Sequence, residues 1–525
     1  MRPGRGGAFR VQIAFFLFIW GFTFVTAGWF AWSARWLHRY GDAWKPAVVM
    51  GIAVTSCFAL LAGLLTWTFV ALGRGENGER FDPVPDPIER RLLAPVLAGW
   101  SARTWATALA LVAVIAWAGY CWYLQLRYGL AVTGLGRPVF WGMYIVDFDF
   151  FLGIAYGLVL LSAVLRLAGA DWRRAGQRLA AMGAVFAMIV GPVNILLDLG
   201  RLDHLHKVYA SGRMQSPLLW DVASIMTFLI TCLVYLFLPL IPDFGLLRER
   251  VGGFRKPIYR FLSFGWTGSA AQVAALDRAN RLLAILVVFV AVIVRSVVAW
   301  ITSLTLQPLW HSALTGPMYV LGAIFLSAAV LALLLAAMRR AFGLSAVIRP
   351  VHFDKLGLVL VLCAVVWGYL MVSELLTVSY GNEPDEMAII ATKLSGRFSL
   401  LFWMAVGGLF AAPVALLTRK SWRTAGRVVA ASLAVFVGSW AQLYTELVPV
   451  LEHPRMPLPG SGHYRPAAVE IATFAGCLAA FVLLTMILTR FVPVVAVFYE
   501  RRGRGDAAAQ ATERSREYQA EVTHP

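Results

Sequence analysis

Long apolar stretches separated by short polar segments alternate along nearly the whole chain of 525 residues. A helix that crosses a bilayer needs roughly 20 mainly apolar residues, and twelve stretches meet this requirement. The pattern predicts an all-α polytopic membrane protein with about twelve transmembrane helices. The predicted spans cover residues 10–33, 46–72, 106–126, 138–165, 179–200, 217–242, 282–305, 316–338, 356–379, 395–417, 428–446 and 467–498.

The composition agrees with this class. Hydrophobic residues make up 60% of the chain and charged residues only 14%, with a mean hydropathy of +0.71. Soluble domains are far less apolar. The first stretch is too long for the apolar core of a signal peptide, and no small-residue cleavage site comes before Trp29, so we expect it to stay as an anchor.

The distribution of Lys and Arg predicts the orientation in the membrane. If both termini are cytoplasmic, the inner segments contain 32 Lys and Arg and the outer loops contain 11. The positive-inside rule therefore favours an even number of spans in a bacterial cytoplasmic (inner) membrane, with both termini cytoplasmic. The net charge of +18 is spread over these inner segments without a nucleic-acid-binding module, so we expect contact with the lipid bilayer and none with nucleic acid.

The residues that commonly bind metals argue against a metal cofactor in this chain. The five cysteines stand alone inside predicted spans and form no CxxC motif, so we expect no iron–sulfur cluster, c-type haem or disulfide framework. The eight histidines fall in loops or at span ends, whereas a b-type haem between helices needs axial histidines at membrane depth. If the chain handles electrons, it must do so through a diffusible organic carrier and a partner's cofactors.

Several ionisable residues fall inside the predicted spans, where an unpaired charge costs several kcal/mol. Asp147, Asp149 and Arg295 are predicted to lie deep in the outer half of the membrane. Either they form an ion pair that fixes helix packing, or they line a polar pocket or a proton path. The full set in the outer half is Asp147, Asp149, Asp198, Asp221, Arg295, Glu374, Glu446 and Glu470.

Ordered sequence matches point to one family. The stretch from Phe140 to Gly157, FWGMYIVDFDFFLGIAYG, resembles the first bundle helix of the NrfD-like polysulfide reductase membrane subunits, and looks closest to the branch found in alternative complex III. Met143-Tyr144-Ile145 is also echoed by Met318-Tyr319-Val320 in a later span. Further matches are LSAVL at 161–165, LGR at 199–201, SPLLWD at 216–221, LIPD at 240–243, WHS at 310–312, GPMYVLGA at 316–323 and SE at 373–374.

The resemblance covers residues 85–500 and implies two four-helix bundles with flanking helices. The predicted divisions are a two-helix extension with a cytoplasmic loop at 1–105, a core at 106–447 with bundles at about 138–305 and 316–446, a C-terminal transmembrane helix at 448–498 and a cytoplasmic polar tail at 499–525.

The resemblance also implies a function in the electron transport of a respiratory chain. It implies a quinone, menaquinone or ubiquinone, bound in the first bundle near the outer (P) side, and no metal in the subunit itself. The implied partners are an iron–sulfur subunit on the P side, molybdopterin-family or c-type cytochrome subunits and other membrane subunits. Coupling to proton translocation stays open.

Three positions depart from the alternative complex III pattern. Tyr156 and Arg295 stand where that branch usually has histidine, and Asp147 stands where it has asparagine. A phenol and a guanidinium both donate hydrogen bonds, so this pocket could still bind quinone carbonyls. The quinone type and the direction of electron flow stay open.

These observations predict three groups of site residues. Residues 149 and 156 share a helix face, whereas 147 and 149 cannot, so one aspartate should face the pocket and the other a neighbouring helix. The predicted quinone contacts are Asp147, Asp149, Tyr156, Arg295, Asp198, Arg201 and Asp221. The predicted proton path contains Asp221 and Glu374, and the predicted partner contacts are His204, His206, Trp310 and His311.

Two other classes of function fit twelve spans. A secondary transporter has similar architecture, but segment 73–105 is long and lacks the short basic signature expected between the second and third spans of the major facilitator class. A non-catalytic membrane anchor would keep the helices without a working pocket. We favour a quinone-reactive subunit, which would not turn over without its complex.

Overall fold

The computed structural model describes residues 45–73, 87–205, 207, 216–454 and 463–502. The described part is helical and contains eleven helices that are long and apolar enough to cross a membrane. These eleven match the second to twelfth predicted spans and confirm the all-α polytopic class. The first predicted span, 10–33, and the tail after Arg502 lie outside the described residues.

Four long helices form the first bundle. Helix α5 packs against α6 and α11, and α8 closes the ring because it also contacts α6 and α11. Each helix is apolar along most of its length, as expected for a bundle without water as its main solvent. The four helices are α5 (Met143–Leu167), α6 (Arg174–Asp198), α8 (Pro217–Phe237) and α11 (Ala270–Ser303).

The second bundle contains the next four spans. One span is interrupted by a π-helical turn, where Gly408 crosses α17 at Gly438; a Cβ on Gly408 would lie 2.3 Å from the carbonyl oxygen of Ala434. Small residues permit such close crossings in membranes. The spans are α12 (Thr315–Ala341), α13 (Pro350–Gly381), α15 (Ser399–Val406) continued by η6 (Gly407–Ala411) and α16 (Ala412–Leu417), and α17 (Ala425–Glu452).

The two bundles are joined along α5, which contacts both α12 and α17. At the crossing of α5 and α12, a Cβ on Gly157 would lie 1.9 Å from the carbonyl oxygen of Ala323, so glycine is required for this approach. The first helices of the two bundles therefore lie directly side by side, which brings residues of α5, α11 and α12 into one layer.

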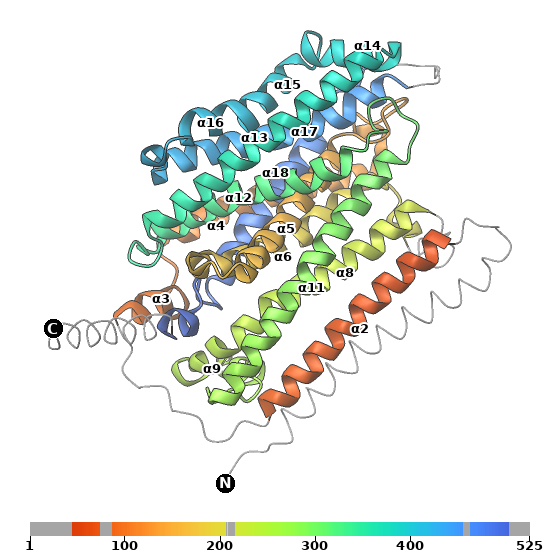
Figure 1. The fold of residues 1–525 in the computed structure, drawn as a ribbon. Coiled ribbons are helices and arrows are strands. Elements are labelled where there is room, and N and C mark those ends of the chain that lie inside the picture. The colour runs from red at the N-terminus through yellow and green to blue at the C-terminus, as the bar shows by residue number, and fades with distance from the viewer. Residues whose placement is uncertain (1–44, 74–86, 206, 208–215, 455–462, 503–525) are drawn as a thin grey trace.

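The other candidate spans of the described residues, α2, α4 and α18, flank the bundles (Figure 1). Helix α2 (Lys45–Gly73) packs against α8 and α11 at one edge of the molecule. Helices α4 (Ala102–Tyr128) and α18 (Ala468–Leu488) pack against each other, and α18 also contacts α6 and α5.

The connections contain short helices that apolar counting does not find. The segment 380–395 was predicted as a loop, but it contains α14, whose start has Pro384 followed by two acidic residues in the first turn. The short helices are α3 (Pro87–Leu97), η2 (Gly129–Val132), η3 (Asp171–Arg173), η4 (Leu202–His204), η5 (Leu238–Leu240), α9 (Ile241–Arg250), α10 (Arg255–Leu262), α14 (Pro384–Leu394) and η7 (Lys420–Trp422).

Two predicted span boundaries were also wrong. Helix α11 begins at Ala270, twelve residues before the predicted start, because Ser269 accepts the backbone N–H of Gln272 as an N-cap and the helix continues beyond its apolar part. Helix α18 ends at Leu488, whereas the apolar stretch continues to 498, because turns around Pro493 replace the last predicted turns of helix.

The helix ends gather as two groups at opposite ends of the molecule. One group, which we call the outer end, contains residues 129–142, 304–314 and 463–467. The sequence predicts that this group faces outside. Here the Tyr464 hydroxyl accepts the backbone N–H of Met143 at 2.8 Å. The inner end is the opposite group, where Arg490 donates to the carbonyl oxygen of Pro95 at 2.8 Å.

Candidate functional site

A buried ion pair joins the two bundles. The guanidinium of Arg295 on α11 contacts the carboxylate of Asp149 on α5, and both side chains are almost fully buried. Arg295 also donates its Nε–H to the carbonyl oxygen of Tyr319 on α12 at 3.3 Å and lies over the Tyr319 ring, 4.6 Å from its centroid. Helices α5 and α11 of the first bundle and α12 of the second therefore all contact the Arg295 guanidinium, and the Asp149 carboxylate balances its charge.

A cavity of about 140 Å³ lies on the outer-end side of this pair. Three carboxyl groups line it, from Asp149 on α5, Asp198 at the end of α6 and Asp221 near the start of α8. Most of its remaining wall is apolar, which is the composition expected of a site for a mainly apolar ligand with a few polar atoms. The apolar lining residues include Trp141, Ile145, Phe148, Ile195, Leu218, Ile301, Leu443 and Leu447.

Two of the cavity carboxyl groups have unsatisfied oxygens. One oxygen of Asp198 and one of Asp221 are buried without a hydrogen-bond partner in the described structure. Most buried polar atoms in proteins have a partner, so each such exception calls for an explanation. A ligand that presents hydroxyl groups to the cavity would give both oxygens a donor.

Asp147 faces away from this cavity. It is fully buried, and its Oδ1 accepts the indole N–H of Trp440 on α17 at 2.8 Å. Asp149 and Asp147 thus point to different neighbours, as the two-residue spacing predicts. Because Asp147 does not line the cavity, any effect that it has on a quinone there must act through Trp440 or through packing.

A smaller cavity of about 40 Å³ lies on the second-bundle side of the ion pair. Asp149 and Arg295 line it together with Gln442 and Glu446 of α17, and Gln442 donates to Glu446 at 2.5 Å. The pair therefore separates a cavity in the first bundle from polar side chains in the second.

Glu374 belongs to the second bundle. It is half-buried on α13. Burial lowers the pKa of Lys393 on the outer helix α14, and the nearby carboxylates of Glu374 and Glu446 oppose this lowering. Glu446 also lines the small cavity beside the ion pair, whereas Glu374 does not.

Tyr156 lies on α5 farther from the outer end than the cavity residue Asp149. Its ring packs against Phe228 with centroids 4.3 Å apart, and the Arg295 guanidinium is 6.0 Å from its centroid. The buried hydroxyl has no hydrogen-bond partner among the described residues, and Tyr156 does not line either cavity next to the ion pair. Its contact with a quinone stays a prediction.

Arg201 is also outside the cavity. It is exposed after the end of α6 and pairs with Asp203 at 2.8 Å. Hydrogen bonding from Arg201 lowers the pKa of Asp203 to about 2. His204 is 3.2 Å from Arg201 in the same loop. This exposed group stays a predicted contact, but the structure does not bring Arg201 to the three cavity carboxyl groups.

The predicted partner contacts differ in exposure. His204 and His311 are exposed at the outer end, whereas His206 lies outside the described residues. Trp310 is buried: it stacks on Trp141 with centroids 6.1 Å apart and donates its indole N–H to the carbonyl oxygen of Glu446 at 2.8 Å. Trp310 therefore packs inside this chain, and its contact with a partner stays a prediction.

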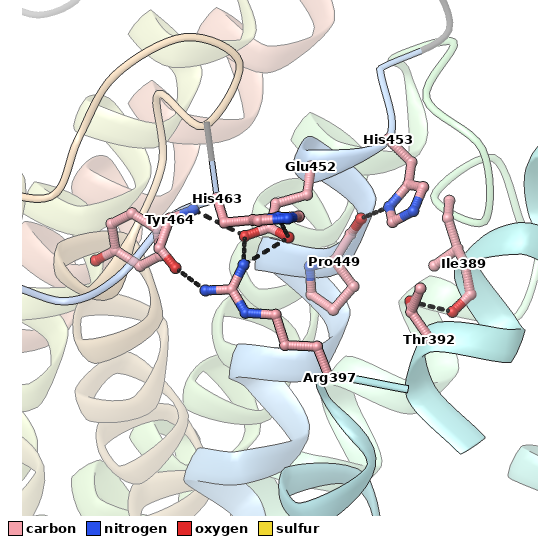
Figure 2. A network of polar contacts seen from close by, with 8 residues as sticks. All are labelled: Ile389, Thr392, Arg397, Pro449, Glu452, His453, His463 and Tyr464. Atoms are coloured by element: carbon pink, nitrogen blue, oxygen red, sulfur yellow. Dashed lines mark hydrogen bonds and ion pairs between the residues drawn. The ribbon is translucent and has the colours of Figure 1, made fainter. Parts of the chain in front are cut away.

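A polar network that the sequence did not reveal fixes the outer end (Figure 2). Arg397 bonds to Glu452 at 3.0 Å and to the carbonyl oxygen of Tyr464 at 2.5 Å. The Tyr464 hydroxyl donates to Glu470, which also accepts the backbone N–H of Gly134 at 2.8 Å. Burial and the Glu470 charge raise the pKa of Tyr464. Loops from both halves of the chain are thereby tied together beside the cavity.

The metal-ligating residues do not gather in the described structure. No group of three or more His, Cys, Asp or Glu side chains there has the arrangement of a metal site. All five cysteines are buried and free. The expectation that this chain holds neither haem nor a cluster stays a prediction.

Comparisons with known proteins find similarity to membrane subunits of oxidoreductases. A family model described as "Polysulphide reductase, NrfD" matches residues 131–452. A Halobacterium salinarum protein, provisionally named as a membrane subunit of dimethyl sulfoxide reductase, is 28% identical over 426 residues, 76% of this chain and 94% of the relative.

Two further relatives extend this result. The Hdr-like menaquinol oxidoreductase integral membrane subunit of Archaeoglobus fulgidus is 25% identical over 69% of this chain and 83% of its own length. A selenate reductase subunit of Mesobacillus selenatarsenatis is 22% identical over 71% of this chain and 90% of its own.

Proposed function

The chain belongs to the NrfD polysulphide reductase family, and we propose that it is the quinone-binding membrane subunit of a multisubunit redox complex. The observation that carries this proposal is the outer cavity of about 140 Å³, which combines apolar walls with the carboxyl groups of Asp149, Asp198 and Asp221. The name of the Archaeoglobus fulgidus relative, a menaquinol oxidoreductase subunit, supports a quinol as the ligand.

The cavity residues have distinct roles in this proposal. Oxidation of a quinol to a quinone releases two electrons and two protons. The unsatisfied carboxyl oxygens of Asp198 and Asp221 accept hydrogen bonds from the two hydroxyl groups and then receive the protons. Arg295 holds Asp149 in position through their ion pair, and its guanidinium compensates the aspartate charge in apolar surroundings. Reduction of a quinone uses the same groups in reverse.

In this proposal the electrons pass to the cofactors of a partner subunit. We propose an iron–sulfur subunit at the outer (P) side, working with a molybdopterin-family or c-type cytochrome subunit. Similarity to the alternative complex III branch belongs to the same proposal, as does a proton path from Asp221 through the Glu446 and Glu374 region. The exposed His204 and His311 lie at the end where such a partner would dock.

Substitution of Asp221 by Asn tests the site in the purified complex. We expect quinol turnover to fall by at least ~10-fold with normal assembly, because an amide cannot accept the proton that the carboxylate takes. The control is Asp385→Asn, an exposed carboxylate on α14 at the same end of the molecule but away from the cavity. Equal turnover in both variants would remove the site from this cavity and favour a non-catalytic anchor.

Tyr156→Phe adds a second arm to this experiment. We expect it to lower turnover less than Asp221→Asn, because the Tyr156 hydroxyl does not line the cavity. Its removal leaves no other group unpaired, so assembly should be normal. A larger loss in Tyr156→Phe than in Asp221→Asn would place the quinone deeper in the first bundle.

A further inference from the structure

A second, larger cavity lies at the inner end of the first bundle, far along the helices from the proposed quinone site. Its volume is about 510 Å³, within the range of roughly 300–1,000 Å³ that is common for small-molecule sites. The ends of α5, α6, α8 and α11 and the segment after α18 form its wall. Its charged lining residues are Arg166, Arg173, Arg174, Arg178, Arg281, Arg502 and Asp277.

Half of these arginines have a carboxylate partner among the described residues. Arg178 pairs with Asp243 at 2.5 Å, Arg174 pairs with Asp171 at 2.8 Å and Arg502 pairs with Asp277 at 2.7 Å. Among the described residues, no carboxylate forms an ion pair with the other three, Arg166, Arg173 and Arg281. The cavity therefore has an excess of positive charge that its own wall does not neutralise.

Several donors in this wall are also unsatisfied. The Nε–H of Arg166, the Nε–H of Arg173 and the side-chain amide nitrogen of Gln177 are buried and have no hydrogen-bond partner in the described structure. Buried donors without a partner are rare. A cavity that collects three such donors and three uncompensated guanidinium groups fits a ligand that is anionic and has several acceptor oxygens.

We propose that this cavity, called the arginine cavity below, binds a phosphate group. Phosphate oxygens accept several charge-assisted hydrogen bonds at once, and guanidinium groups match their geometry. The phosphate of an anionic lipid headgroup is the favoured source, because basic pockets between transmembrane helices at the cytoplasmic side suit such headgroups. The lining residue Leu167 is 43% exposed beside the cavity and offers an apolar surface for an acyl chain.

Lipid binding to the purified, delipidated complex tests the proposal. Phosphatidylglycerol and phosphatidylcholine are titrated separately while bound lipid is counted by native mass spectrometry. The double variant Arg166→Gln/Arg173→Gln should weaken phosphatidylglycerol binding ~10-fold, and Arg281→Gln should weaken it ~3-fold. Arg281 is exposed, so its variant should fold even if the double variant does not. The matched control is Arg340→Gln, an exposed arginine in the last turn of α12 outside the cavity.

Inorganic phosphate supplies the second arm and separates the two sources. Stabilisation of the delipidated wild type by phosphate, lost in Arg281→Gln, together with weak lipid binding, would identify free phosphate as the ligand. Tight phosphatidylglycerol binding that falls in the cavity variants alone would identify the lipid headgroup. Equal lipid binding in all variants, with no effect of phosphate on unfolding, would overturn the proposal. None of these outcomes depends on quinol turnover.

Discussion

The two ends of the first bundle hold cavities of opposite charge. At the outer end, three aspartates line the cavity, and among the described residues only Asp149 of these three has an arginine partner, Arg295. At the inner end, six arginines face one carboxylate of the lining, Asp277, which is itself paired. The same four helices therefore present proton acceptors at one end and hydrogen-bond donors for anions at the other.

The difference in charge between the two cavities reflects two roles of charged residues in a membrane protein. Arginines near the inner end can remain charged at little cost because water and anionic headgroups are close. Carboxylate oxygens buried among apolar side chains cannot, and they persist there only with a partner or a function. Asp149 has the partner, whereas the unsatisfied Asp198 and Asp221 are the residues for which a function in proton transfer is most needed.

The contrast between the two cavities requires that the outer and inner ends lie on opposite sides of the membrane. We predict that Asp385→Cys on α14 is labelled by a membrane-impermeant thiol reagent in intact cells, and that Arg340→Cys on α12 is labelled only after permeabilisation. Both native residues are exposed, and the five native cysteines are buried. The effect is all-or-none, and it follows from the excess of Lys and Arg at the inner end. The reverse labelling pattern would contradict the orientation with both termini cytoplasmic.

The next largest effect concerns the ion pair that separates the outer cavity from the second bundle. Arg295→Gln should lower the free energy of unfolding by about 3–5 kcal/mol, because it leaves Asp149 buried without its counterion. Thermal unfolding in lipid nanodiscs measures this loss. The double variant Arg295→Gln/Asp149→Asn should recover a large part of it, since no charge remains unpaired. A double variant less stable than the single one would mean that Arg295 acts mainly through Tyr319.

The sequence predicted the membrane-crossing elements well because apolar length is a local property. Eleven of the predicted spans are helices in the described residues. The contact between Asp149 and Arg295 could also be predicted from the sequence, because two opposite charges at similar depth in the membrane stabilise each other. Short helix α14 was missed although Pro384 and its acidic first turn indicate a helix start, because apolar counting gives no weight to such signals.

Other features of the site depend on how distant helices are rotated against each other. Asp147 bonds to Trp440, 293 positions away, and nothing in the local pattern of either helix predicts this contact. Tyr156 shares a helix face with Asp149, yet its neighbour is Phe228 rather than the cavity. Trp310 lies in a loop at the outer end, yet its side chain is buried within this chain. The periodicity of a helix predicts which residues share a face, but only the packed structure shows which neighbouring residues that face contacts.

The smallest expected effect is at the exposed rim of the outer end, where Arg201 pairs with Asp203. Hydrogen bonding from Arg201 lowers the pKa of Asp203 to about 2 in the folded chain, below the value of about 3.9 for an unfolded aspartate. A carboxyl group with a lowered folded pKa stabilises the fold above the unfolded pKa, and this contribution is lost as the pH falls through the folded pKa. Asp203→Asn should therefore reduce the thermal midpoint slightly at pH 6, and the difference from wild type should shrink below pH ~4 and vanish only below pH ~2. A difference for Asp203→Asn that persists undiminished at pH ~2 would show that Asp203 acts through the conformation of its loop and not through its charge.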